Sequence, residues 1–148
     1  MEIITIDFES YYGADYTLSK MTTEDYVRDP RFEVILVSVK LKGATRWFSG
    51  TMQQTGTWLT QFDIPHHALL AHNMSFDGLI LQHHFGIVPA MYLDTRLMAQ
   101  AKYKPFTGSA SLKACMQYIS YDLPFNLCID DESQPTFLLS CSFLASGS

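Results

Sequence analysis

The sequence predicts an α/β protein with a mixed sheet, built from a three-strand antiparallel meander plus two further strands and flanked by helices. Residues 2–9 alternate apolar and polar side chains, which is typical of a half-buried strand. Residues 33–41 form a β-branched run that a Lys-Gly turn at 42–43 connects to residues 44–48. From residue 67 onward, short apolar runs alternate with segments of helical periodicity.

The later elements follow from local signals along the chain. In order, we expect an irregular segment over 10–31, a helix over 51–62, a strand over 67–71, a helix to about residue 85, a strand over 91–93, a helix over 94–103 and a helix to about residue 119. Side chains that accept a hydrogen bond from a helix N-terminus precede the last three helices. These candidate caps are Asn73 or Ser75, then Asp94, then Ser109 or Ser111.

The length and composition fit one compact domain of this class. The chain has 148 residues, of which 47% are apolar and 14% aromatic, enough for a sizeable core. Its formal net charge of −5 disfavours a nucleic-acid binder that only neutralises phosphates, so such chemistry would take its positive charge from bound metal. Three cysteines without Cys-x-x-Cys spacing, no signal peptide and no long apolar run predict a cytoplasmic protein with no membrane partner.

The sequence changes character after residue 120. We expect a domain over 1–120 and a divergent tail over 121–148, which either stands apart or completes the same domain. A proline in the first turn favours an apolar helix over 136–145, and that stretch contains no acidic residue.

Two acids lie at the end of the first predicted strand. Asp7 and Glu9 are two residues apart, so their side chains point to the same face, ~6.6 Å apart along the strand. Neighbouring buried carboxylates raise one another's pKa unless a cation compensates, and oxygen ligands suit Mg²⁺ or Mn²⁺. By itself the pair also fits an ordinary polar strand terminus.

A second polar cluster begins the helix that follows residues 67–71. Asn73 and Asp77 lie one turn apart there. The helix dipole favours the ionised form of an acid in the first turn, which leaves Asp77 available for a metal or a water molecule. The alternative is a capped helix that simply carries an acid near its N-terminus.

Together, the two clusters resemble the DEDD (DnaQ-like) family of 3′→5′ exonucleases, which share a ribonuclease H-like fold. Asp7-x-Glu9 resembles the first family motif, and Asn73-x-x-Phe76-Asp77 resembles the second. The stretch 93–95, Leu-Asp-Thr, resembles the strand-to-helix step that follows in the family.

Three further segments narrow the resemblance. Residues 7–12, 18–26 and 28–33 resemble the proofreading domain at the front of phage DNA polymerases of the A family, and the likeness covers roughly residues 1–120. It implies a phage-encoded protein in the cytoplasm of a bacterial host, with single-stranded DNA 3′ ends as substrate and RNA as the alternative.

The resemblance also implies a two-metal hydrolysis with Mg²⁺ or Mn²⁺. By this likeness Asp7 bridges both ions, Glu9 binds the first and Asp77 holds the second, directly or through water. Four residues are implied to position the terminal nucleotide, namely Phe8, Ser10, Asn73 and Phe76.

One part of the family pattern is missing. The family needs a fourth carboxylate four or five residues after a Tyr or His on a late helix, and Asp122 in Tyr118-x-x-x-Asp122 is the candidate. It follows the predicted 111–119 helix sooner than the family spacing requires, so the match is short enough to be a coincidence.

Two hypotheses therefore stay open. The first is a metal-dependent 3′→5′ exonuclease domain, truncated or impaired. The second is a catalytically weak exonuclease-like fold that binds nucleic acid or a protein partner, including a second copy of the chain through apolar residues of the tail. An acidic mimic of nucleic acid fits the sign of the charge but needs a larger excess of acids.

Overall fold

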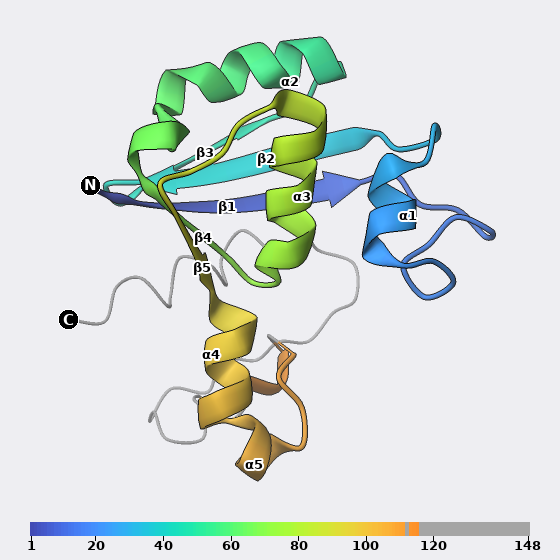
Figure 1. Cartoon of the computed structure of the whole chain (residues 1–148), viewed down its shortest axis with the longest axis vertical. Helices are drawn as coiled ribbons and strands as arrows, with labels where there is room; N and C mark the ends of the chain where they lie inside the picture. Colours follow the sequence, from blue (N-terminus) through green and yellow to red (C-terminus); the bar gives the residue numbers. More distant parts are fainter. Residues whose placement is uncertain (112, 116–148) are drawn as a thin grey trace.

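Five strands form a single mixed sheet in a computed structural model, which describes residues 1–111 and 113–115 (Figure 1). The sheet order is β3-β2-β1-β4-β5, with β1 and β2 antiparallel, β2 and β3 antiparallel, and β1, β4 and β5 parallel. The predicted meander and the two further strands are confirmed. The strands are β1 (Ile3–Ser10), β2 (Val34–Leu41), β3 (Ala44–Phe48), β4 (Ala68–Ala71) and β5 (Met91–Asp94).

Within residues 1–111, five α-helices connect and flank these strands. They are α1 (Thr23–Arg28), α2 (Met52–Leu59), α3 (Met74–Phe85), α4 (Thr95–Lys102) and α5 (Lys104–Thr107), with short 3₁₀ turns at Thr60–Phe62 and Ile64–His66 after α2. Figure 1 shows α4 and α5 beyond the end of β5, away from α1 and α2. None of the helices in residues 1–111 and 113–115 has both the length and the apolar character needed to span a bilayer.

Two of these helices were not predicted, because their local signals are weak. Helix α1 has six residues, and the Thr22 side chain caps it by accepting from the Asp25 N–H. Such a short helix is unstable alone, but Tyr26 and Val27 are buried and α1 packs against α3. Helix α5 has only four residues, with a proline in its first turn.

The core lies between the sheet and the helices that pack on one of its faces. Ile4 and Ile6 of β1 and Leu69 of β4 meet Ile80 and Leu81 of α3, and each of these side chains is at most 1% exposed. The alternation in β1 explains why Ile4 and Ile6 are buried, because every second side chain of the strand faces the helices. The other face of β1 carries the predicted acids.

Some sequence predictions fall outside the described residues. They are the part of the predicted 111–119 helix after residue 115, the domain boundary at residue 120, the tail over 121–148, the apolar helix over 136–145 and Asp122.

Candidate active site

Asp77 reaches β1 at the point where β1 and β4 separate. The parallel pairing of these strands ends at Thr5 with Leu70, so the later part of β1 has no strand partner from β4. There, the Phe8 N–H donates to the Asp77 carboxylate over 3.1 Å, in place of a ladder hydrogen bond. An acid of α3 is thereby attached to the backbone between Asp7 and Glu9.

Burial acts on all three predicted acids, and a neighbouring negative charge adds to it at Asp7 and Asp77. Asp77 is 3% exposed, and its burial, with the nearby Asp7 charge second, raises its pKa well above the usual range, although the Phe8 hydrogen bond opposes this. Burial raises the pKa of Asp7 to about 6, and the Glu9 charge adds to the effect. Glu9 is exposed as a whole residue, but partial burial of its carboxylate also raises its pKa. A divalent cation would relieve this repulsion.

The donor set fits an oxygen-preferring cation only in part. The Asp77 carboxylate accepts from the backbone N–H of Phe8, the residue after Asp7, and the Asp7 charge acts on it, which suits Mg²⁺ or Mn²⁺. Glu9 is exposed at the end of β1. Within residues 1–111 and 113–115, no group of three or more His, Cys, Asp or Glu side chains lies close enough together to hold a metal ion.

The Phe8 side chain belongs to the core. Its ring is 4% exposed and stacks on Phe85 with centroids 6.1 Å apart. The predicted contact between Phe8 and a nucleotide is therefore not available to its ring, and its backbone N–H already binds Asp77.

Asp94 supplies the N-terminal cap of α3. The sequence predicts Asn73 or Ser75 for this role. Asn73 has φ 99° and makes no capping hydrogen bond with its side chain. Instead, Asp94 Oδ1 and Oδ2 accept from the N–H groups of Asn73 and Met74 at 3.2 and 3.0 Å. The parallel register places Asp94 beside Ala71, so the ends of β4 and β5 meet at one edge of the sheet.

The same carboxylate caps a second helix. It accepts from the N–H groups of Arg96 and Leu97 at the start of α4, as the sequence predicted. Because Asp94 binds the N-termini of two helices, it fixes where the Asn73 end of α3 stands relative to the sheet. The sequence signal for the cap on α3 is the acid Asp94 itself, because it ends β5, the strand that pairs in parallel with β4.

We expect Asp94→Ala to lower the free energy of unfolding by about 1–4 kcal/mol, since one cap contributes about 0.5–2 kcal/mol and two are lost. Urea unfolding followed by circular dichroism measures the change. The matched control is Thr51→Ala, which removes the Thr51 half of the capping box of α2 and should cost less. Equal losses for the two variants would contradict the double role of Asp94.

The Asn73 side chain is directed to its neighbours at the helix start. Its Oδ1 accepts from Ser75 Oγ at 2.9 Å and from the Arg96 guanidinium at 3.1 Å. Arg96 is exposed, so a cation stands beside the residue predicted to contact a nucleotide.

Ser10 and Phe76, the other two predicted nucleotide contacts, meet at one buried side chain that the sequence had not singled out. The Tyr26 hydroxyl lies 2.9 Å from Ser10 Oγ and donates to the Tyr11 carbonyl. The Tyr26 ring lies 6.1 Å from the Phe76 ring, centroid to centroid. Helix α1 thus joins the end of β1 to the first turn of α3.

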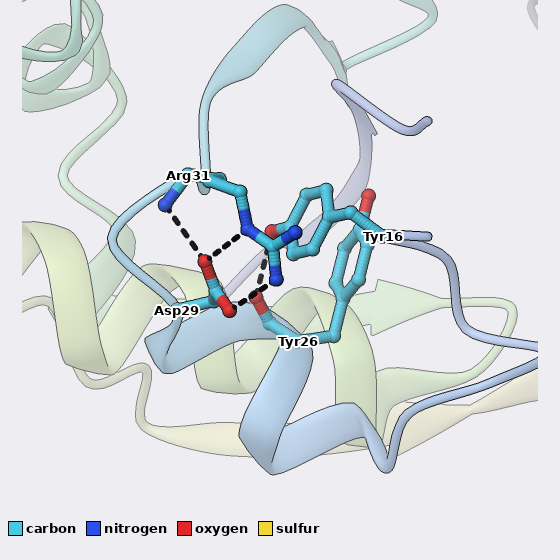
Figure 2. Close-up of polar contacts among 4 residues, drawn as sticks. All are labelled: Tyr16, Tyr26, Asp29 and Arg31. Carbon is cyan, nitrogen blue, oxygen red and sulfur yellow. Dashed lines mark hydrogen bonds and ion pairs between the residues drawn. The ribbon is translucent and has the colours of Figure 1, made fainter. Parts of the chain in front are cut away.

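A polar and aromatic cluster holds Tyr26 in place (Figure 2). The Tyr16 ring stacks on Tyr26 at 4.4 Å, and its hydroxyl donates to the Tyr26 carbonyl at 2.7 Å. The Arg31 guanidinium lies 4.6 Å from the centre of the Tyr16 ring and makes two 2.8 Å hydrogen bonds to the Asp29 carboxylate. These bonds lower the pKa of Asp29 to about 2, whereas burial raises that of Tyr16 to about 12.

A sheet of order β3-β2-β1-β4-β5, with an antiparallel meander and two parallel strands under helices, defines a ribonuclease H-like fold. The solved structure of NrnC from Brucella melitensis with bound Mg²⁺ is similar, with a TM-score of 0.51 and 16% sequence identity. The match covers 95% of this chain and 64% of that one, so the chain spans less than two thirds of its neighbour. At this identity the likeness shows the fold, as the sequence predicted.

No protein-family model and no curated protein matches the sequence. The narrower resemblance to phage polymerase proofreading domains therefore stays a prediction.

Proposed function

We propose that the chain is a metal-dependent 3′→5′ exonuclease domain of the DnaQ-like type that acts on single-stranded DNA ends. The hydrogen bond between the buried Asp77 carboxylate and the Phe8 N–H carries this proposal, because it brings an acid of α3 to the strand that holds Asp7 and Glu9. A domain without a cation to bind has no physical need for carboxylates that raise one another's pKa.

Asp7, Glu9 and Asp77 would hold Mg²⁺ or Mn²⁺, with two ions in the fully active enzyme. The ions would supply an activated water molecule and would stabilise the leaving oxygen of the phosphodiester. They also offset the repulsion between phosphate and a chain of net charge −5. Glu9 is exposed, so its side chain has room to turn toward the other two acids when a cation enters.

The chain's own residues position the substrate. The Asn73 side chain, beside Arg96, lies at the start of α3, and Ser10 follows Glu9 at the end of β1. Phe76 contacts Tyr26 from the first turn of α3. These groups hold the terminal nucleotide over the acids, and Asp122 is the candidate for the fourth carboxylate.

The test is a single-stranded DNA oligonucleotide labelled at its 5′ end and incubated with Mn²⁺ or Mg²⁺. We expect a ladder of products shortened from the 3′ end, and no shortening with EDTA or with a blocked 3′ end. An RNA oligonucleotide of the same sequence measures the preference between the two substrates. An oligonucleotide that stays intact at high protein concentration would overturn the proposal.

A second candidate function is a binding module with little turnover. It is favoured by one observation, namely that residues 1–111 and 113–115 contain no closed group of three metal-ligating side chains. Binding of the labelled oligonucleotide without cleavage, in the presence of Mn²⁺, would establish this second function.

A further inference from the structure

The segment between β1 and β2, residues 11–33, contains none of the proposed metal ligands or nucleotide contacts. It nevertheless contacts the candidate site through one side chain, Tyr26 of α1, which is 2% exposed. Its hydroxyl binds Ser10 and the Tyr11 carbonyl, and its ring contacts Phe76. One buried residue thus touches both elements that carry the proposed acids.

The Tyr26 hydroxyl lies where the sheet becomes irregular. The pairing of β1 with β2 shifts register between Glu9 and Ser10, directly after the second proposed acid. A shift of this kind redirects the following side chain and leaves the ladder locally disrupted. The hydroxyl of Tyr26 meets the chain at this place and fixes the direction of Ser10.

We propose that Tyr26 is a positioning residue of the candidate site, whose hydroxyl holds the redirected end of β1 against Phe76 so that Ser10 and Phe76 grip the terminal nucleotide together. The proposal rests on the exonuclease function proposed above. Tyr26 is not proposed to touch the substrate or the acids; it acts through Ser10, and its hydrogen bond to the Tyr11 carbonyl orients the hydroxyl.

The surrounding cluster gives Tyr26 the rigidity that this role requires. Tyr16 stacks on one side of its ring, and Phe32 meets it edge-on with centroids 5.9 Å apart. Arg31, held by Asp29, lies over Tyr16 and keeps that ring in place (Figure 2). Tyr16, Arg31 and Phe32 therefore brace the Tyr26 ring, and precise support of this kind is what substrate positioning needs.

The test compares Tyr26→Phe with Tyr16→Phe. Each variant removes one hydroxyl from the same stack and keeps the ring, but only Tyr26 contacts Ser10. We expect Tyr26→Phe to raise KM for the oligonucleotide about two- to tenfold, the effect of one hydrogen bond, with little change in kcat. Tyr16→Phe should lower Tm to a similar extent and leave KM within twofold of the wild type.

A readout without catalysis accompanies the kinetics. Fluorescence anisotropy measures the Kd of the labelled oligonucleotide with Ca²⁺ in place of Mg²⁺, and the same two- to tenfold weakening is expected for Tyr26→Phe alone. Ser10→Ala should weaken binding similarly, and the double variant Ser10→Ala with Tyr26→Phe should be no worse than either, because both act through one contact.

The outcomes separate the two proposals. Equal changes in KM and Kd for Tyr26→Phe and Tyr16→Phe would show a purely structural role and overturn the inference, as would additive effects of Tyr26→Phe and Ser10→Ala. A wild-type protein that neither cleaves nor binds the oligonucleotide would overturn the exonuclease proposal, and the positioning role would fall with it.

Discussion

Asp77→Asn is expected to lower metal-dependent cleavage of single-stranded DNA by about 10²- to 10⁴-fold, the usual loss when a charged group of the reaction centre is removed. The substitution keeps the shape of the side chain and an oxygen that accepts from the Phe8 N–H, so the contact between α3 and β1 persists. It removes only the negative charge. The initial rate of oligonucleotide shortening in Mn²⁺ measures the effect.

The matched control is Asp63→Asn, which makes the same chemical change at an acid bound to His66 in the turns after α2. This variant should cleave within about twofold of the wild-type rate, since a surface charge outside the site contributes little. A fully active Asp77→Asn protein, with a folded circular dichroism spectrum, would contradict the placement of the reaction at Asp77.

The second large effect is stabilisation by the metal itself. Mg²⁺ or Mn²⁺ at a hundred times its Kd should stabilise the folded protein by about 2.7 kcal/mol, which is roughly 5–10 °C in Tm for a domain of this size. The physical reason is that burial and mutual repulsion disfavour the ionised forms of Asp7 and Asp77 in the metal-free protein, and the cation reverses this. Thermal unfolding with and without EDTA measures the shift.

Asp7→Asn should abolish the metal-dependent rise in Tm and should also raise the Tm of the metal-free protein. It removes a proposed shared ligand, so the metal-dependent rise in Tm is lost. It also removes a partly buried charge that repels Asp77 and Glu9, so the metal-free variant should melt above the metal-free wild type. A shift in Tm equal to that of the wild type would show that the ion binds elsewhere, and a shift absent from both proteins would contradict the metal site.

The strands were predictable because their signals are local. Alternation in β1 and the β-branched run of β2 mark which residues face the core, and the same alternation places Asp7 and Glu9 on one face. Helix α1 was not predictable in this way, because its six residues are stabilised by burial of Tyr26 against side chains distant in sequence.

The sequence by itself determined the order of the five strands and of helices α2, α3 and α4, the candidate acids and their place near the ends of the elements that carry them. Only the tertiary structure decided which side chains meet: Asp77 with the Phe8 N–H, Asp94 with the start of α3, and Tyr26 with Ser10. The reason is that hydrophobic period and capping preference act within a few residues, whereas these hydrogen bonds depend on where strands end and separate in the finished sheet.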